Sequence, residues 1–281
     1  MSKLLELDHV TKLYPVGGLF SRKSIKAVND VSFSLDADKP EIFAIVGESG
    51  SGKSTIAKMM LGNEVPNSGR LVFDGVDIGT IRNRAQREAF MANVQPVFQN
   101  PFEAFNPLTR VDAYLFGTAH RFAGAITLHE KEAVCDQALQ RVGLSMAEIK
   151  GRFSHELSGG QLQRVAVARA LIPSPKLIVA DEPVSMVDAS LRMSIVNLFR
   201  SLRDELKVSI IYITHDLATA YYISDRVVIM QKGVVIESGD ARAVLDNPTH
   251  PYSIALKNAV LPPDPKAASA AIRLRGVRAA I

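Results

Sequence analysis

The sequence has few of the features that mark secreted, cluster-binding or membrane-spanning proteins. Its 281 residues include one cysteine, Cys135, and no tryptophan. A single thiol cannot form an internal disulfide, a cysteine zinc site or an iron–sulfur cluster, which fits a reducing compartment. The longest apolar runs, such as Ile42–Val46, fall far short of the roughly 18 residues of a membrane helix. Glu6 and Asp8 interrupt the segment where an export signal would be apolar, so we expect neither a membrane span nor export by that route.

Charge of either sign is not in large excess. Hydrophobic residues make up 47% of the chain and charged residues 22%, values that exclude disorder over most of its length. The 33 basic and 29 acidic side chains give a net charge of +4. This mild excess favours a mixed, solvated surface, with an anionic partner such as nucleic acid or lipid as the alternative. At about 150 residues per domain, the length predicts roughly two domains.

The chain divides into strand-rich ends and a helical middle. From 108 to 157 apolar residues recur at helical spacing, as in Leu128–Val142, and no strand is predicted. Elsewhere short β-branched runs alternate with helical patterns such as Ala189–Leu206, which indicates a largely parallel sheet in an α/β fold. A loop is predicted at Gly17–Ala27, and residues 261–281 form a tail that is solvated or contacts a partner or lipid. The predicted strands are Lys3–Val10, Val31–Leu35, Glu41–Val46, Gly69–Asp74, Lys176–Ala180, Ser209–Thr214 and Arg226–Met230.

A glycine-rich loop follows the predicted strand that ends at Val46. Its sequence, GESGSGKST, matches the pattern G-x-x-x-x-G-K-[ST] and leads into a helix-forming segment. The glycines allow backbone N–H groups to surround phosphates at the positive end of that helix. Lys53 is expected to reach the β- and γ-phosphates, and the Ser54 hydroxyl to bind Mg²⁺. The nucleotide-binding residues predicted here are Gly47, Glu48, Ser49, Gly50, Ser51, Gly52, Lys53, Ser54 and Thr55.

Two adjacent carboxylates end the apolar run Leu177–Ala180. Because side chains alternate along a strand, Asp181 and Glu182 are expected to point in different directions. Asp181 is expected to hold Mg²⁺, usually through water, while Glu182 faces the water that attacks the γ-phosphate. The alternative for this pair alone is a strand that simply reaches solvent; the phosphate-binding loop upstream favours the catalytic interpretation.

A second segment suited to anions is LSGGQ, Leu157–Gln161, which precedes the helix-forming sequence LQRVAVARAL. A serine and two glycines at a helix N-terminus present N–H groups to an anion. Two such cradles in one chain are explained if the second closes on a nucleotide held by another subunit. In this position before Asp181–Glu182, the pentapeptide resembles the signature of ATP-binding-cassette (ABC) ATPases. The signature residues expected to contact nucleotide are Ser158, Gly159, Gly160 and Gln161.

The resemblance assigns further roles by position within quoted motifs. It implies that Tyr14 in TKLYPV stacks on adenine and that Gln99 in VFQNP senses Mg²⁺ and the attacking water. It also implies that Asp188 in SMVDAS crosses a dimer interface and that His215 in YITHDL contacts the γ-phosphate. Taken alone, Tyr14 and His215 would more often be packing residues. The implied catalytic residues are Glu182, His215, Gln99 and Lys53, and the implied metal ligands are Ser54, Gln99 and Asp181.

The implied fold is an α/β P-loop NTPase cassette with a mixed-sheet core, an antiparallel β subdomain and an inserted α-helical subdomain. We expect residues 1–107 and 158–246 to form the ATP-binding core, and residues 108–157 to form the helical subdomain. Residues 247–281 are expected to be a C-terminal extension. That extension, with the sequence PTHPYSIALKNAV, and the stretch Phe98–Val111 are similar to the oligopeptide/dipeptide group of importer ATPases.

That group also includes motors for nickel, glutathione and oligosaccharides, so these solutes stay as alternatives to peptides. Two departures from the family pattern are visible: the loop reads SMVD where SALD is commoner, and the C-terminal cysteine cluster of some members is not matched. The first is a small apolar exchange that should leave the site functional. From the second we expect no metal cluster.

The implied assembly contains ATP, Mg²⁺, two permease subunits and a second, non-identical ATPase subunit, with a solute-binding protein joining through the complex. It places the chain on the cytoplasmic face of a bacterial inner membrane, held by permease contacts. Phe102 and Phe105 are equally compatible with permease docking and with a core position. A soluble ABC ATPase acting on nucleic acid or ribosomes, and an exporter subunit, are the competing functions; one cassette and one cysteine disfavour the former, and we expect no nucleic-acid partner.

Overall fold

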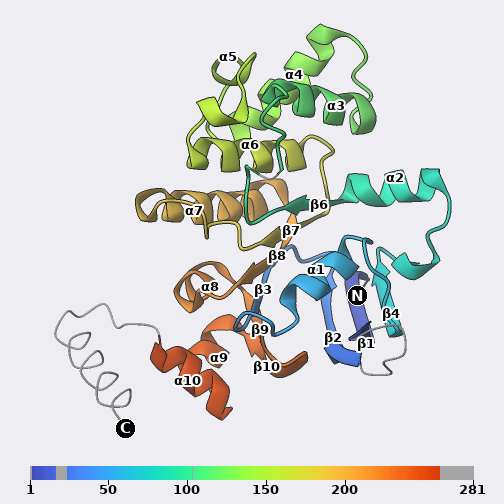
Figure 1. The fold of residues 1–281 in the computed structure, drawn as a ribbon, viewed down its shortest axis with the longest axis vertical. Helices are drawn as coiled ribbons and strands as arrows, with labels where there is room; N and C mark the ends of the chain where they lie inside the picture. Colours follow the sequence, from blue (N-terminus) through green and yellow to red (C-terminus); the bar gives the residue numbers. More distant parts are fainter. Residues whose placement is uncertain (1, 17–23, 103, 260–281) are drawn as a thin grey trace.

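The structure is a computed structural model that describes residues 2–16, 24–102 and 104–259. Figure 1 shows a central sheet with a small sheet on one side and helices on the other. The small sheet is antiparallel, in the order β2-β1-β4-β5. Its strands are β1 (Lys3–Pro15), β2 (Ser24–Asp36), β4 (Ser68–Phe73) and β5 (Val76–Asp77).

The central sheet has the order β10-β9-β3-β8-β7-β6, in which only β10 runs antiparallel to its neighbour. Its inner strands are short and fully buried, as expected when both faces of a parallel sheet are covered. The mixed sheet and the antiparallel sheet together confirm the predicted fold class. The strands are β3 (Ile42–Val46), β6 (Val94–Val97), β7 (Leu177–Asp181), β8 (Ser209–Thr214), β9 (Arg226–Gln231) and β10 (Val234–Asp240).

Helices complete the layers on both sides of the central sheet. On one face lies α1 (Lys53–Met60) with the small sheet; on the other lie α7 (Ala189–Leu206), α8 (Leu217–Ile223) and α9 (Ala241–Asp246) (Figure 1). A helical cluster stands beyond α7. It comprises α3 (Val111–Phe122), α4 (Leu128–Arg141), α5 (Met146–Ile149) and α6 (Gly159–Leu171). The remaining elements are α2 (Arg84–Asn93), α10 (Pro251–Ala259), and the short 3-10 turns Ile78–Thr80 and Ser154–Glu156.

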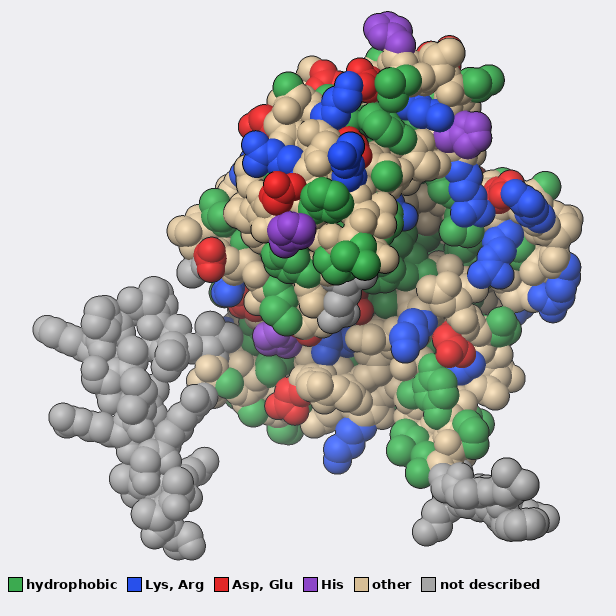
Figure 2. Space-filling model, turned by 45° about the horizontal axis from the view of Figure 1, so that its top comes forward, with side chains coloured by type: hydrophobic (Ala, Val, Ile, Leu, Met, Phe, Trp, Pro, Cys, Tyr) green, Lys and Arg blue, Asp and Glu red, His purple; other side chains and the backbone are tan. Residues whose placement is uncertain are grey.

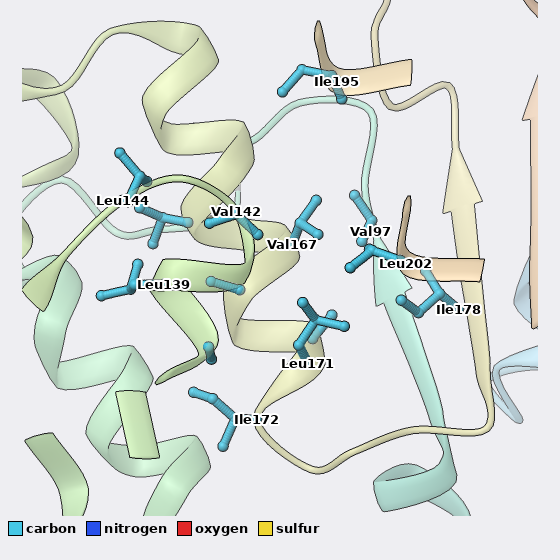
Figure 3. Packing of buried hydrophobic residues seen from close by; sticks show 14 of the residues in the cluster. Val97, Leu139, Val142, Leu144, Val167, Leu171, Ile172, Ile178, Ile195 and Leu202 are labelled. Carbon is cyan, nitrogen blue, oxygen red and sulfur yellow. The ribbon is translucent and has the colours of Figure 1, made fainter. Parts of the chain in front are cut away.

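Alternation along β3 divides the core between the two faces of the sheet. Phe43 and Ile45 pack against α1 and the small sheet, whereas Ile42 packs toward α6 and α7. Ala44 and Val46 face α8 and α9. Figure 3 shows Val167 and Leu171 of α6 lying between side chains of the α4 region, such as Leu139, and those of β6, β7 and α7, which include Val97, Ile178 and Leu202. The helical cluster therefore shares one continuous core with the sheet and does not stand as a separate unit.

The N-terminal strands are longer than the sequence predicts. β1 and β2 pair as an antiparallel hairpin with several register shifts, and β2 begins at Ser24, so Ser24–Ala27 are strand and not loop. The other part of the predicted loop, and the tail 261–281, lie outside the described residues. β5, β6 and β10 are not among the predicted strands. Among the described residues, no helix combines the length and apolar character needed to cross a membrane.

Candidate functional site

Four segments singled out in the sequence meet at one edge of the central sheet. They follow the carboxyl ends of four consecutive strands in the sheet, β3, β8, β7 and β6. The phosphate-binding loop follows β3, His215 follows β8, Asp181 and Glu182 lie at the end of β7, and Gln99 follows β6. Open α/β sheets bind ligands just outside this edge. The parallel register thus joins residues that are far apart in the chain.

The phosphate-binding loop is closely enclosed, and two of its glycines are required by that enclosure. A Cβ at Gly47 would lie 2.3 Å from the Met230 carbonyl oxygen, and one at Gly52 2.3 Å from that of Ala27. Gly52 also has φ 105°, where L side chains are strained. The Ser51 carbonyl accepts a hydrogen bond from the Gly233 N–H at 3.0 Å. A backbone folded this tightly at the start of α1 has the form of a phosphate-binding loop and fits the phosphates of a nucleoside triphosphate.

Lys53 is turned back onto this loop. Its Nζ donates to the carbonyl oxygens of Gly47 at 2.6 Å and Glu48 at 2.8 Å, and its side chain is buried. Burial lowers the pKa of Lys53, and the nearby carboxylates of Glu182 and Asp181 act in the opposite direction. The ammonium group is therefore held at the mouth of the loop with carbonyl partners that an anion can replace.

Asp181, at the end of β7, lies near Ser54 in the first turn of α1. Burial raises the pKa of Asp181, and repulsion from Glu182 adds to the rise, while Ser54 and the lysines Lys53 and Lys58 oppose it. A hydroxyl and a carboxylate oxygen at adjoining positions are hard ligands of the kind Mg²⁺ prefers. The residues present therefore fit a magnesium ion that also binds the nucleotide's phosphates.

Glu182 follows the last residue of β7, and its carboxylate contacts two of the other candidate residues. Its carboxylate lies 3.0 Å from Nδ1 of His215, and its second oxygen accepts from Nε2 of Gln99 at 3.2 Å. Its backbone has φ 46°, an uncommon conformation for a residue other than glycine, and its N–H is fixed by Ile213. The Glu182 carboxylate is thus held by two side chains on a strained backbone, and it lies beside a small cavity of about 90 Å³. In that position it can orient a water molecule.

The signature segment forms the N-terminus of α6. Ser158 Oγ accepts from the Gln161 N–H at 3.2 Å, and Gln161 Oε1 accepts from the Ser158 N–H at 3.0 Å, a reciprocal capping box. Gly160 packs beneath Leu191 of α7, where a Cβ would come within 2.8 Å of the leucine side chain. Asp188 precedes α7 and is exposed. The signature segment thus lies against the start of α7.

Tyr14 lies apart from the strand-end cluster. It sits on β1 opposite Ile25 of β2, with the Lys12 ammonium 5.4 Å from its ring centroid. The same Lys12 ammonium forms an ion pair with Glu64 at 2.6 Å. The structure thus brings together the phosphate-binding loop, Asp181, Glu182, Gln99 and His215, while Tyr14 lies on β1 and the signature at the start of α6.

Sequence reasoning missed one contact of the phosphate-binding loop. Tyr252, at the start of α10, accepts a hydrogen bond from the Glu48 N–H through its hydroxyl at 2.9 Å. Glu237 of β10 in turn binds the segment before α10, accepting from the Thr249 N–H at 2.5 Å and the His250 N–H at 2.8 Å. The only signal available was the resemblance of the segment 247–253 to importer ATPases, which assigns no role to Tyr252.

Comparison with known sequences gives consistent matches. The family described as "ABC transporter" matches residues 28–185. The oligopeptide transport ATP-binding protein AppF of Bacillus subtilis is 41% identical over 263 residues, covering 92% of this chain and 78% of that protein. The oligopeptide transport ATP-binding protein AmiF of Streptococcus pneumoniae is 36% identical, covering 94% of this chain and 83% of that protein.

Solved structures share the same fold. The ATP-binding cassette MJ0796, in a dimeric post-hydrolysis state bound to ADP and Pi, superposes with a TM-score of 0.74 at 26% identity, covering 85% of this chain and 99% of that one. CbiO1 of Clostridium perfringens, described as part of an ABC transporter complex, gives a TM-score of 0.73 at 27% identity, covering 93% of this chain and 97% of that one.

Proposed function

This chain belongs to the ABC transporter family, and we propose that it is the ATP-hydrolysing subunit of an importer that takes up oligopeptides or dipeptides through a separate permease. The peptide assignment is supported by the names of the similar proteins, which are oligopeptide or peptide transport ATP-binding proteins. Import of a related solute, such as an oligosaccharide, nickel or glutathione, is the alternative within the same mechanism.

The observation that carries the proposal is the position of Glu182. Its carboxylate, held between Gln99 and His215, acts as the base that orients and polarises water for in-line attack on the γ-phosphoryl group. His215 and Lys53 stabilise the charge that develops on the γ-phosphate. Phosphoryl transfer depends chiefly on such positioning and electrostatic stabilisation, since little covalent chemistry falls to the protein.

Mg²⁺ would be held by Ser54 and Asp181, with Gln99 on the side of the attacking water. When bound, the ion neutralises phosphate charge and fixes the phosphates in line. Lys53 meanwhile exchanges its bonds to the Gly47 and Glu48 carbonyls for phosphate oxygens. Tyr14, on β1, stacks on the adenine ring.

Two ATPase subunits close head to tail around two ATP molecules. Each nucleotide lies between the phosphate-binding loop of one subunit and Ser158–Gln161 of the other, with Asp188 crossing the interface. The dimeric state of the similar cassette MJ0796 supports this arrangement. The partner subunit is proposed to be a non-identical homologue, and a solute-binding protein joins through the permease.

The permease docks in a hollow between the helical cluster and α2. Figure 2 shows a depression there with hydrophobic side chains inside it. Its cavity, of about 290 Å³, is lined by Phe98, Pro101 and Phe122 among others, with Arg121 and Arg169 also present. Attachment there places the chain at the cytoplasmic face of a bacterial inner membrane.

Of the two phenylalanines considered for docking, Phe105 is 1% exposed and packs edge-on against Tyr114, so it is a core residue. Phe102 is 45% exposed and stays available for docking.

The test of the hydrolytic assignment is Glu182→Gln. We expect ATP binding within about twofold of the parent and turnover lower by about 10²- to 10⁴-fold, as for loss of a general base. Phosphate release gives the turnover, and equilibrium binding of labelled ATP gives the affinity. Glu205→Gln, at an exposed position of α7, is the matched control and should hydrolyse at the parent's rate. Unchanged turnover in Glu182→Gln would remove this residue from the mechanism.

The importer assignment is tested by isolating the assembled complex through a tag on this chain. We expect two permease subunits and a second ATPase subunit to co-purify, and a peptide-loaded solute-binding protein to stimulate hydrolysis. Recovery of ribosomes or nucleic acid in their place would favour the soluble ABC ATPase. Stimulation by nickel- or oligosaccharide-loaded binding protein alone would replace the peptide with that solute.

A further inference from the structure

The C-terminal segment contacts the phosphate-binding loop at the residue that also holds Lys53. The Glu48 N–H donates to the Tyr252 hydroxyl at 2.9 Å. The carbonyl of the same residue accepts from Lys53 Nζ at 2.8 Å and from the Ser51 N–H at 3.2 Å. One short path of hydrogen bonds therefore joins Tyr252, Glu48 and the lysine that faces the phosphates.

Tyr252 is itself fixed from two directions. Glu237 accepts hydrogen bonds from the backbone N–H groups of Thr249 and His250 and from the Thr249 hydroxyl, so the turn before α10 is anchored to β10. The Tyr252 ring packs against the buried cluster that contains Val46, the last residue of β3 before the loop. A hydroxyl supported in this way has a defined position relative to the loop.

We propose that the segment 247–259 braces the phosphate-binding loop and that Tyr252 is a positioning residue for nucleotide binding. The first half of the loop, Glu48–Gly50, is exposed, and the Tyr252 hydroxyl fixes the plane of the Gly47–Glu48 peptide there. A fixed Glu48 also orients its own carbonyl group, which accepts a hydrogen bond from Lys53 Nζ. Lys53 gives up that hydrogen bond when it binds the phosphates. This inference rests on the proposed function, because the loop must bind nucleotide for its order to matter.

Coupling of this kind acts in both directions. If docking of the segment 247–259 strengthens nucleotide binding, bound nucleotide must stabilise docking of the segment by the same factor.

The test is Tyr252→Phe in the full chain, which keeps the ring and removes only the hydroxyl. Loss of one neutral hydrogen bond is expected to raise the ADP dissociation constant and the KM for ATP about threefold to tenfold, with kcat within about twofold of the parent. Tyr221→Phe is the matched control, because its hydroxyl lies in the same cluster, 3.3 Å from Asp246. We expect that control to leave KM unchanged. Isothermal titration calorimetry with ADP and steady-state kinetics provide the two readouts.

The outcomes separate this inference from the proposed function. Equal KM and ADP affinity in Tyr252→Phe and Tyr221→Phe, with an active parent, would overturn the brace and leave the ATPase assignment intact. A lower melting temperature in Tyr252→Phe with unchanged KM would also overturn it, because a merely structural role predicts that pattern. A parent that neither binds ADP nor hydrolyses ATP would overturn the proposed function itself.

Discussion

Glu237→Gln is expected to loosen the C-terminal segment while leaving the rest of the fold intact. Glu237 is half-buried on β10 and accepts from Thr249 and His250. Burial alone raises its pKa, but hydrogen bonds from the Thr249 hydroxyl and from the backbone N–H groups of Thr249 and His250 outweigh this and lower the pKa to about 2. A neutral amide at this position accepts the same bonds without their charge, so the turn before α10 is held less firmly.

The loss of stability expected in Glu237→Gln can be worked out from the lowered pKa of Glu237. Lowering a carboxyl pKa from 4.5 to about 2 corresponds to about 3.4 kcal/mol of preference for the ionised form. Because the side chain is partly exposed, solvent screening reduces the usable part to on the order of 1–2 kcal/mol. The folded pKa lies below the unfolded one, so this stabilisation is complete above pH 4.5 and is lost as the pH falls toward 2.

Amide hydrogen exchange within α10 measures this directly. In Glu237→Gln at pH 7, we expect the α10 amides to exchange about five- to thirtyfold faster than in the parent, while those of β3 and β8 keep their rates. Glu205→Gln serves as the control, since it removes a charge from an exposed position on α7. At pH 3 the difference between parent and variant should shrink. Equal exchange at pH 7, or a difference that grows on acidification, would refute the reasoning.

Two further predictions concern packing. Gly52→Ala should lower the free energy of unfolding in urea by about 1–3 kcal/mol more than Gly50→Ala does. Both glycines have positive φ, but only at Gly52 would a Cβ meet a backbone oxygen, that of Ala27. Equal losses in the two variants would contradict this. Cys135 is buried and burial raises its pKa to about 12, so it should resist iodoacetamide at pH 8 until the protein is unfolded, as read by mass spectrometry. Labelling of the native chain would show that α4 opens readily.

The site residues that follow β3, β7 and β8 could be predicted from the sequence because buried parallel strands have the sequence pattern of short apolar runs. The runs that end at Val46, Ala180 and Thr214 each give way to a chemically distinctive residue, and their carboxyl ends meet at one edge of the sheet. β6 has only four residues and includes a proline, so it gives a weak strand signal. The hydrogen bond between Gln99 and Glu182 depends on that strand and could be expected only through the motif around Gln99.

Contacts that depend on tertiary structure could not be predicted. Tyr252 and Glu48 are 204 positions apart in the chain, and nothing local to either residue indicates the other. The extent of β1 and β2 was underestimated because their outer halves carry polar and charged residues and several register shifts. Such strands are stabilised by cross-strand pairing and not by a clear alternation in one strand.

The chain enters the helical cluster after β6 and returns to the central sheet at β7, the neighbouring strand. This connection affects how the sheet can assemble. β6 and β7 pair from Val94 with Leu177 to Val97 with Ala180, although α3 to α6 lie between them in the chain. Joining the strands first would close a long unstructured loop, whose entropic cost rises with its length. Contacts close in sequence form faster, so we expect the helices of the cluster to pack before β6 and β7 pair. The edge of the sheet that holds Glu182 and Gln99 is then expected to form only after α3 to α6, which contribute no strand to it, have packed.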